Sequence, residues 1–222
     1  MMITLILSTA PPILLAPAAA TAFSALAVLA YQAAHRAGGY SPMAREIPTA
    51  MMARVGPALS AHSSRVAEFS EAIARALECR SEDADLIVAA ARLHDIGKSR
   101  VPAAVLNKPG PLTQAEWEVM RAHAEIGANA LQDCPAFAKL AAIVRHHHER
   151  WDGRGYPHQL RATTIPLGAR IIAVADSFDA MTSDRPYHRR MRAEEAVNVL
   201  RQGRGTQWDA VIVDTFLECL PR

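Results

Sequence analysis

Apolar residues recur at helical spacing from Ser60 onwards. The first stripe contains Val66, Phe69, Ile73 and Leu77, and steps of three or four residues place such positions on one helix face. Similar stripes predict further helices after Ser81, from the capping box Thr113-Gln-Ala-Glu116 to Leu131, after Pro135, from about Pro166 to Phe178, and over 193–202 and 206–220. Because no stretch shows the alternation of a strand, we predict an all-α domain.

The first 36 residues form an apolar segment that lacks the alternating apolar and polar faces of the helices after Ser60. Residues 1–34 contain no Asp, Glu, Lys or Arg, and prolines interrupt their first half. Residues 18–34 are about the minimum length for a membrane-spanning helix, so the segment is either a membrane anchor, a helix packed on the domain or a loose tail. If it inserts, His35, Arg36 and Arg45 favour a cytoplasmic location for the rest. Residues 37–59, rich in glycine and proline, are typical of a linker that leads into a domain over 60–222.

Composition narrows the classes of function. A formal net charge of +2 over 222 residues is too small to favour binding of duplex nucleic acid. The three cysteines, Cys79, Cys134 and Cys219, are scattered, which is typical of free thiols in a reducing compartment. Seven of the nine histidines fall between His62 and His158, and this clustering makes metal binding worth testing.

Helical spacing places several of these polar residues on inner faces. His62 precedes Val66 by one turn, and His147 and His148 continue the apolar stripe of the fourth predicted helix, whereas His146 falls on its outer side. The inward donors are His62, His94, Asp95, His123, His147, His148 and Asp176. These seven exceed the needs of one four-coordinate ion, so we infer two ions, and imidazole with carboxylate suits Fe, Mn or Zn.

The alternative is a set of ordinary core residues. A single inward histidine is more often a hydrogen-bonded core residue than a ligand, and Asp176 alone could cap a helix or pair with an arginine. Five histidines and two aspartates that face inward together favour the metal site.

Several motifs then identify a resemblance. They are His94-Asp95-Ile96-Gly97-Lys98, NKPGPLT at 107–113, HHERWDGRGYP at 147–157, IPLGARIIAVADSFDAMTSDRPY at 165–187 and GRGT at 203–206. Over residues 60–216 the chain resembles the HD-GYP subfamily of the HD superfamily of metal-dependent phosphohydrolases. The resemblance implies an HD-domain helical bundle with a C-terminal helical GYP extension. It also implies a bacterial phosphodiesterase that cleaves cyclic di-GMP to pGpG and then GMP at a binuclear or trinuclear iron or manganese centre.

The resemblance carries the family's metal ligands onto the same seven residues, with Asp95 bridging the ions. Trinuclear members carry a glutamate four residues before the first histidine, and that position is Ala58 here, so we expect two metals. By the same resemblance Lys98 lies near the scissile phosphate, and Tyr156 and Arg185 hold the dinucleotide. Asp179 is grouped with these substrate-binding residues, although its place just outside the ligands suits it to orient a ligand or a water.

One departure concerns the residue after Arg-Pro-Tyr, where the family usually has Arg or Lys and this chain has His188. A histidine is only partly charged at neutral pH, so a phosphate grip by His188 would be weaker than in relatives and would improve as the pH falls towards about 6.

The implied mechanism is in-line attack on a phosphorus of cyclic di-GMP by a hydroxide that the two ions activate. Two other functions stay open: a catalytically weak module that senses cyclic di-GMP or binds other proteins, and a phosphohydrolase of another cyclic dinucleotide. Candidate partners besides cyclic di-GMP are a GGDEF-type diguanylate cyclase at the GYP loop, the inner face of the bacterial plasma membrane, and a second copy of the chain.

Overall fold

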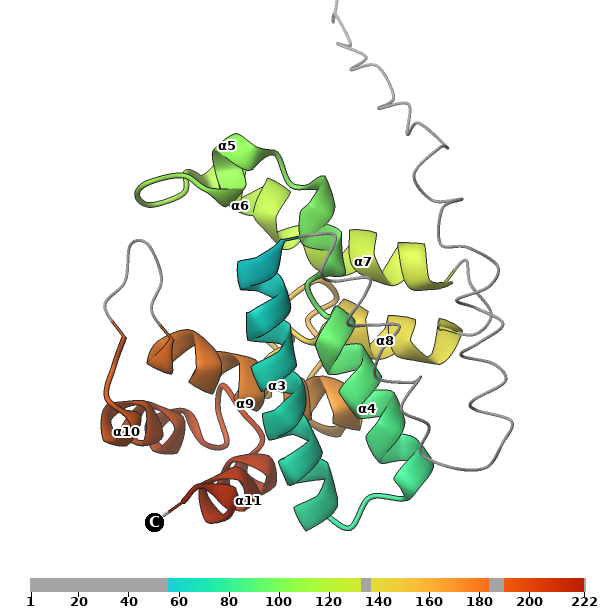
Figure 1. Cartoon of the computed structure of the whole chain (residues 1–222), viewed down its shortest axis with the longest axis vertical. Helices are drawn as coiled ribbons and strands as arrows, with labels where there is room; N and C mark the ends of the chain where they lie inside the picture. Colours follow the sequence, from blue (N-terminus) through green and yellow to red (C-terminus); the bar gives the residue numbers. More distant parts are fainter. Residues whose placement is uncertain (1–55, 133–136, 184–189, 222) are drawn as a thin grey trace, which may run out of the picture.

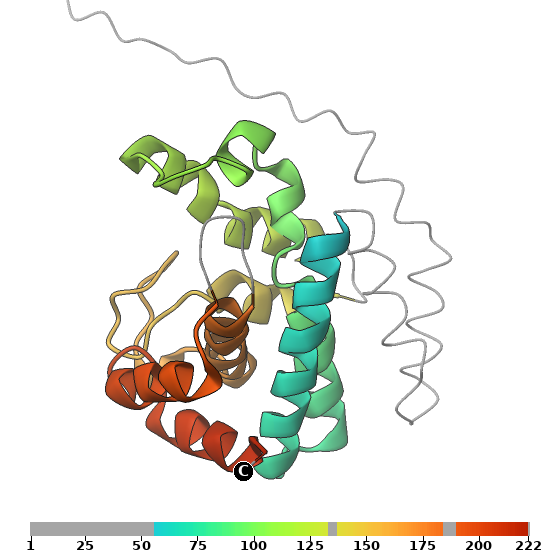
Figure 2. The ribbon, with the colours of Figure 1, turned by 60° about the vertical axis from the view of Figure 1, so that its left-hand side comes forward.

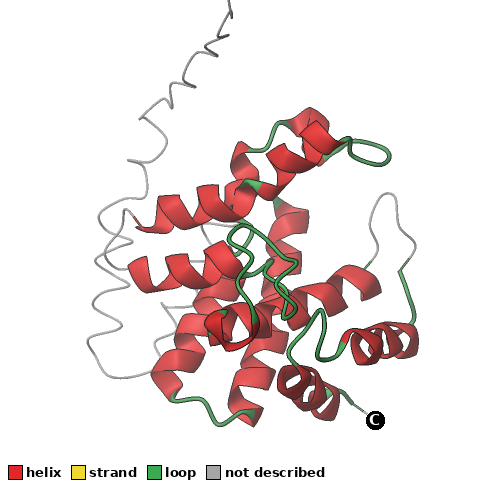
Figure 3. Cartoon of the chain, turned by 180° about the vertical axis from the view of Figure 1, so that it is seen from behind, coloured by secondary structure: helices red, strands yellow, loops and turns green. Residues whose placement is uncertain are grey.

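The computed structural model describes residues 56–132, 137–183 and 190–221. Within these ranges the chain forms helices and no strand, which confirms the all-α prediction (Figure 3). The helices are α3 (Pro57–Ala76), α4 (Ser81–Leu93), η2 (Ile96–Arg100), α5 (Ala103–Leu106), α6 (Gln114–Arg121), α7 (His123–Gln132), α8 (Ala138–His146), η3 (Ala162–Thr164), α9 (Leu167–Thr182), α10 (Ala193–Gly203) and α11 (Ala210–Cys219).

Helix α3 lies at the centre of the bundle (Figure 1). It packs against α4, α9 and α11, while α8 packs against α4, α7 and α9. The short helices α5 and α6 lie at one end of the bundle, and α10 and α11 lie at the other (Figures 1 and 2). The long helices therefore surround one interior to which α3, α4, α7, α8 and α9 all contribute.

The C-terminal helices belong to the same core. Phe69 of α3, Phe178 of α9 and Phe216 of α11 meet edge to face, with ring centroids 5.0 to 5.6 Å apart. Aromatic pairs in this geometry contribute about 0.5–1.5 kcal/mol each beyond the burial of their area. The extension after α9 is therefore packed on the rest of the domain as an integral layer.

Some boundaries differ from those that the sequence predicts. Helix α3 begins at Pro57 and not at Ser60, because proline is well suited to the first helical turn; the predicted linker thus ends before residue 57. The predicted helix from Thr113 to Leu131 is two helices, α6 and α7, separated at Ala122. The capping box of Thr113 and Glu116 is confirmed. Helix α11 begins at Ala210, where the side chain of Asp209 accepts a hydrogen bond from the backbone N–H of Val211.

The predicted membrane anchor over residues 1–36 and most of the predicted linker lie outside the described residues. None of the helices in the described part of the chain is both long enough and apolar enough to span a bilayer.

Two glycines allow η2 to lie directly on α7. A Cβ atom on Gly97 would be 2.0 Å from the carbonyl oxygen of His123 and 2.7 Å from the backbone nitrogen of Gly127. In return, a Cβ on Gly127 would be 3.1 Å from the backbone nitrogen of Gly97. This contact sets the separation between the His94-Asp95 pair and His123, because Asp95 lies two residues before Gly97 and the backbone of His123 is itself part of the contact.

The loop that follows α8 is attached to a distant part of the chain. The backbone N–H of Trp151 donates to the carbonyl of Gln207 at 3.1 Å, and that of Asp152 donates to the carbonyl of Thr206 at 2.9 Å. The turn before α11 therefore supports the loop, which we call the GYP loop (residues 149–158).

Candidate metal centre

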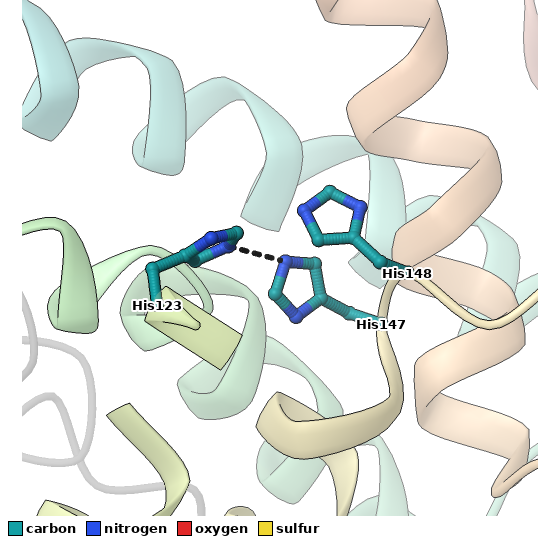
Figure 4. A group of neighbouring side chains, drawn as sticks. All are labelled: His123, His147 and His148. Carbon is teal, nitrogen blue, oxygen red and sulfur yellow. Dashed lines mark hydrogen bonds between the residues drawn. The ribbon is translucent and has the colours of Figure 1, made fainter. Parts of the chain in front are cut away.

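All seven inward donors predicted from the sequence meet in the interior of the bundle. Each of three overlapping groups places one ligand atom per residue within 4.8 Å of the others. The groups are His123, His147 and His148; His62, His94 and Asp176; and His94, Asp95 and His147. Figure 4 shows the first group, with His123 on α7 facing the two histidines at the end of α8.

Asp95 lies between the two groups that share no residue. Its Oδ1 is 3.3 Å from Nε2 of His123, and its Oδ2 is 3.4 Å from Nε2 of His94 and 3.9 Å from Nε2 of His62. One carboxylate therefore presents an oxygen to each side, as a ligand shared by two ions would. On the far side, Oδ1 of Asp176 is 3.2 Å from Nε2 of His62.

Backbone carbonyls fix the orientation of three of these rings. The Nδ1 atoms of His94, His123 and His147 lie 2.6–2.7 Å from the carbonyl oxygens of Ala91, Met120 and Val144, in each case three residues earlier. A carbonyl only accepts, so Nδ1 carries the hydrogen and Nε2 keeps a free lone pair that faces the centre. This arrangement is usual for histidines that bind metals, because the second nitrogen needs a partner that fixes the ring.

Burial keeps the histidines of the first group neutral. It lowers the pKa of His123 and, more strongly, that of His147, and it brings the pKa of His148 down to about 3. A neutral imidazole is the form that binds a metal. These three rings therefore release no proton when they bind a metal at neutral pH.

The second group has a different charge state. Burial lowers the pKa of His62, but hydrogen bonds with Asp176 and Asp179 outweigh burial and raise it to about 9. Burial raises the pKa of Asp176, but the hydrogen bond with His62 and nearby histidines bring it well below its usual range. Nε2 and Nδ1 of His62 lie 3.2 Å from Oδ1 of Asp176 and 2.6 Å from Oδ2 of Asp179, so the two carboxylates hold the ring from both sides.

Two buried atoms show that the residues fit a cation. Nε2 of His94 and Oδ1 of Asp95 are buried and have no hydrogen-bond partner among the described residues. Leaving such a polar group buried and unsatisfied costs about 1–3 kcal/mol. A divalent ion that accepts nitrogen and oxygen ligands satisfies both atoms, so the donor set suits metals of the Fe, Mn and Zn type.

Lys98 reaches the same carboxylate from the edge of the centre. Its Nζ is 2.6 Å from Oδ2 of Asp95, and its side chain is 21% exposed. Burial raises the pKa of Asp95, but the charges of Lys98 and the neighbouring histidines outweigh burial and lower it well below its usual range. An ammonium beside a buried shared ligand is placed to meet the negative charge of a bound phosphate.

Asp179, which the sequence groups with the substrate-binding residues, lies behind His62. It is 2% exposed, its Oδ2 accepts from Nδ1 of His62 at 2.6 Å, and both oxygens accept from Arg65, the Nε bond being 2.5 Å long. These hydrogen bonds outweigh burial, which raises its pKa, and bring the pKa down to about 2. Asp179 therefore orients His62, because its oxygens are taken by His62 and Arg65.

Arg65 was not predicted from the sequence, although it lies three residues after His62 on the same helix. Its guanidinium also donates to the hydroxyl of Ser183 at 3.0 Å. An arginine one turn from an inward histidine is the signal that could have identified it.

The GYP loop places Tyr156 beside the metal ligands. The ring of Tyr156 lies against that of His148, with centroids 4.8 Å apart. The backbone N–H of Tyr156 donates to the carbonyl of His148, and a Cβ on Gly155 would be 2.4 Å from the backbone nitrogen of Arg150. The loop therefore bends back on the end of α8.

His146 lies on the outer side of α8, as predicted, and the acids of the GYP loop make local contacts. His146 belongs to none of the metal-ligand groups, and its ring contacts the carbonyl of Ala142 and the ring of His158. Glu149 is buried and accepts from the backbone N–H of His158, while Asp152 pairs with Arg150. The predicted substrate contacts Arg185 and His188 lie outside the described residues.

Comparisons with known proteins agree with this site. A family model described as an HD domain matches residues 46–212. A cyclic di-GMP phosphodiesterase of Thermotoga maritima is 42% identical over 71% of this chain and 43% of its own length. A 3′3′-cGAMP-specific phosphodiesterase of Vibrio cholerae is 40% identical over 69% of this chain and 33% of its own length.

Among solved structures, the HDG"Y"P protein Bd1817 of Bdellovibrio bacteriovorus has a TM-score of 0.60 at 21% identity, over 72% of this chain and 51% of that protein. This likeness concerns the fold. The chain spans between about a third and a half of the length of these proteins.

Proposed function

The chain belongs to the HD-domain family, in agreement with its resemblance to the HD-GYP subfamily, and from this we propose that it is a metal-dependent phosphodiesterase that hydrolyses cyclic di-GMP to pGpG or GMP. The observation that carries the proposal is the complete donor set around Asp95, together with relatives named as cyclic di-GMP phosphodiesterases. A module that had lost catalysis would be expected to lack part of this set.

The proposed centre holds two ions, one on each side of Asp95. His62, His94 and Asp176 hold one side, and His123, His147 and His148 hold the other. When bound, divalent ions of the iron or manganese type supply Lewis acidity that activates water and neutralises charge on a phosphate.

The side chains around the centre bind the ions, orient a ligand or contact the phosphate. Asp95 contributes to both sides, Asp179 fixes the ring of His62, and Lys98 presents an ammonium to the phosphate. We assign contact with the rest of the dinucleotide to Tyr156 and Arg185, as the resemblance implies, and to His188, which stands where the family usually has Arg or Lys.

The test uses the full chain, purified without oxygen and loaded with Fe(II) or Mn(II). It is incubated separately with cyclic di-GMP and with 3′3′-cGAMP, and the products are resolved by chromatography. The proposal expects pGpG or GMP from cyclic di-GMP, and loss of turnover in Asp95→Ala. An Asp95→Ala protein with near wild-type turnover would contradict it.

A 3′3′-cGAMP phosphodiesterase is a second candidate because a relative at 40% identity is named as specific for that dinucleotide. The same incubation separates the two, since the preferred substrate has the higher kcat/KM. The GGDEF-type partner, the homodimer, the cytoplasmic location and the association of residues 1–36 with the inner membrane stay predictions from the sequence.

A further inference from the structure

Side chains from α6 and the GYP loop form a stack at the edge of the metal centre. The guanidinium carbon of Arg121 is 5.7 Å from the centroid of the Trp117 ring and 5.4 Å from that of the Tyr156 ring. Tyr156 in turn contacts His148, with centroids 4.8 Å apart. The stack therefore leads from Trp117 through Arg121 and Tyr156 to a residue of the metal centre.

This stack does not belong to the hydrophobic core. Helix α6 buries none of its residues, and Trp117 is 43% exposed. Trp117 and Arg121 are four residues apart, so the helix places them side by side on one face. An exposed tryptophan next to an exposed arginine, at the edge of a candidate catalytic centre that Tyr156 connects to the arginine, is typical of a recognition surface and not of a structural contact.

Among the described residues, no acid neutralises the charge of Arg121. In residues 56–132, 137–183 and 190–221, no ion pair involves Arg121, whereas Arg65, Arg150, Arg170 and Arg204 each pair with an aspartate. A guanidinium that uses its faces against aromatic rings keeps its N–H donors in the plane, where they extend past the ring edges. That geometry suits two parallel hydrogen bonds to one phosphate.

We propose that Arg121 forms a second phosphate subsite, which binds the phosphodiester of the cyclic dinucleotide that is not being cleaved. Trp117 and Tyr156 hold the guanidinium in place as positioning residues. A cyclic dinucleotide has two phosphodiesters, and the metal centre acts on one of them. Arg121 is separated from His148 only by the Tyr156 ring, with spacings of 5.4 and 4.8 Å, so it is close enough to meet the other phosphate but is not itself a member of the metal centre. The inference rests on the proposed function.

The test compares Arg121→Gln with the wild type on two substrates, using the full metal-loaded chain. Cyclic di-GMP has the second phosphodiester, whereas bis(p-nitrophenyl) phosphate has only the one that is cut. Charge-assisted hydrogen bonds of this kind are worth roughly tenfold to a hundredfold in affinity. We therefore expect KM for cyclic di-GMP to rise about tenfold or more, with a much smaller change in kcat and in the kcat/KM for the single phosphodiester.

Two further variants test which property of Arg121 matters and whether the effect is local. Arg121→Lys keeps the charge but loses the planar guanidinium, so most of the rise in KM should persist. Arg201→Gln removes an exposed arginine from α10, at the other end of the bundle, and should leave both substrates unaffected (Figure 1). Calorimetric titration of a hydrolysis-resistant phosphorothioate analogue of cyclic di-GMP into each metal-loaded protein gives a Kd that does not depend on turnover.

The outcomes separate this inference from the proposed function. An unchanged KM for cyclic di-GMP and an unchanged Kd for its analogue in Arg121→Gln would overturn the subsite, and so would equal losses of kcat/KM on both substrates. If the wild type cleaves no cyclic di-GMP, the proposed function fails. The titration then still decides the subsite, because a weaker Kd in the variant supports it and an equal Kd refutes it.

Discussion

The contact between η2 and α7 makes Gly97→Ala a direct test of how the metal centre is positioned. The added methyl group would lie 2.0 Å from the carbonyl oxygen of His123, 2.8 Å from its carbonyl carbon and 2.7 Å from the nitrogen of Gly127. All three atoms are backbone, so no side chain can rotate away. Ordinary contacts of a Cβ begin near 3.4 Å, and the two helices must therefore separate by more than about 1 Å.

The expected effects on stability and on metal retention differ in size. Overpacking of this kind costs about 1–3 kcal/mol, and about 2–4 °C of Tm accompanies each kcal/mol in a chain of this length. We expect a fall in Tm of roughly 2–12 °C. Metal sites tolerate displacements of only about 0.2 Å, so the separation of Asp95 from His123 should remove most of the bound metal.

The assay is metal analysis by mass spectrometry beside thermal unfolding of the same samples. Gly168→Ala is the matched control, because its methyl group would meet Cδ1 of Ile143 at 2.8 Å and Cγ1 of Ile87 at 3.0 Å, which are side-chain and not backbone atoms. The control should lose some stability and keep its metal. A Gly97→Ala protein with wild-type metal content and an unchanged Tm would refute the reasoning.

Four other predictions follow from the structure and the sequence. Asp179→Asn should weaken metal binding about 10- to 100-fold in chelator competition, because His62 loses its charged partner. The control is Asp214→Asn, which changes an exposed acid paired with Arg204 and should have no effect. Equal losses in the two variants would contradict the proposal that Asp179 orients His62. Metal analysis of the wild type should give two ions per chain. Three tightly held ions would contradict the inference that Ala58, in place of a glutamate, leaves no third metal site. Glu116, whose pKa the hydrogen bond from Lys108 helps bring down to about 2, should stabilise the fold above pH 4.5, the ordinary value, and progressively less as the pH falls towards 2. Glu116→Gln should therefore have a lower Tm at pH 6, and a difference that does not shrink in acid would refute the role of the Glu116 charge. His188→Lys should lower KM for cyclic di-GMP at neutral pH, and an unchanged KM would count against a phosphate grip at that position.

Much of the fold and the metal centre follows from periodicity. His62 and His123 are inward because they share a face with Val66 and Gly127, and the structure buries both. The placement of His147 also holds, although α8 ends at His146, because His147 keeps helical backbone angles as the C-cap. A stripe of apolar residues thus predicts the direction of a side chain one or two residues past the end of its helix.

Other features depend on contacts between distant segments, which periodicity does not contain. The approach of Gly97 to Gly127 joins positions thirty residues apart, and neither glycine alone indicates the other. The break at Ala122 has no proline or glycine to mark it. The stack of Arg121 on Tyr156 likewise arises only once α6 and the GYP loop are folded beside each other.

Because the GYP loop is attached to residues 206 and 207, the loop and the candidate metal centre beside it depend on different parts of the chain. The candidate metal ligands all precede residue 177, whereas the loop beside them is held by a turn that follows α10. Insertions or replacements in that turn should therefore displace the loop and Tyr156 while every candidate ligand stays in place. Under the proposed function, such changes would alter the preference for one dinucleotide over another without any change in the residues proposed to hold the ions.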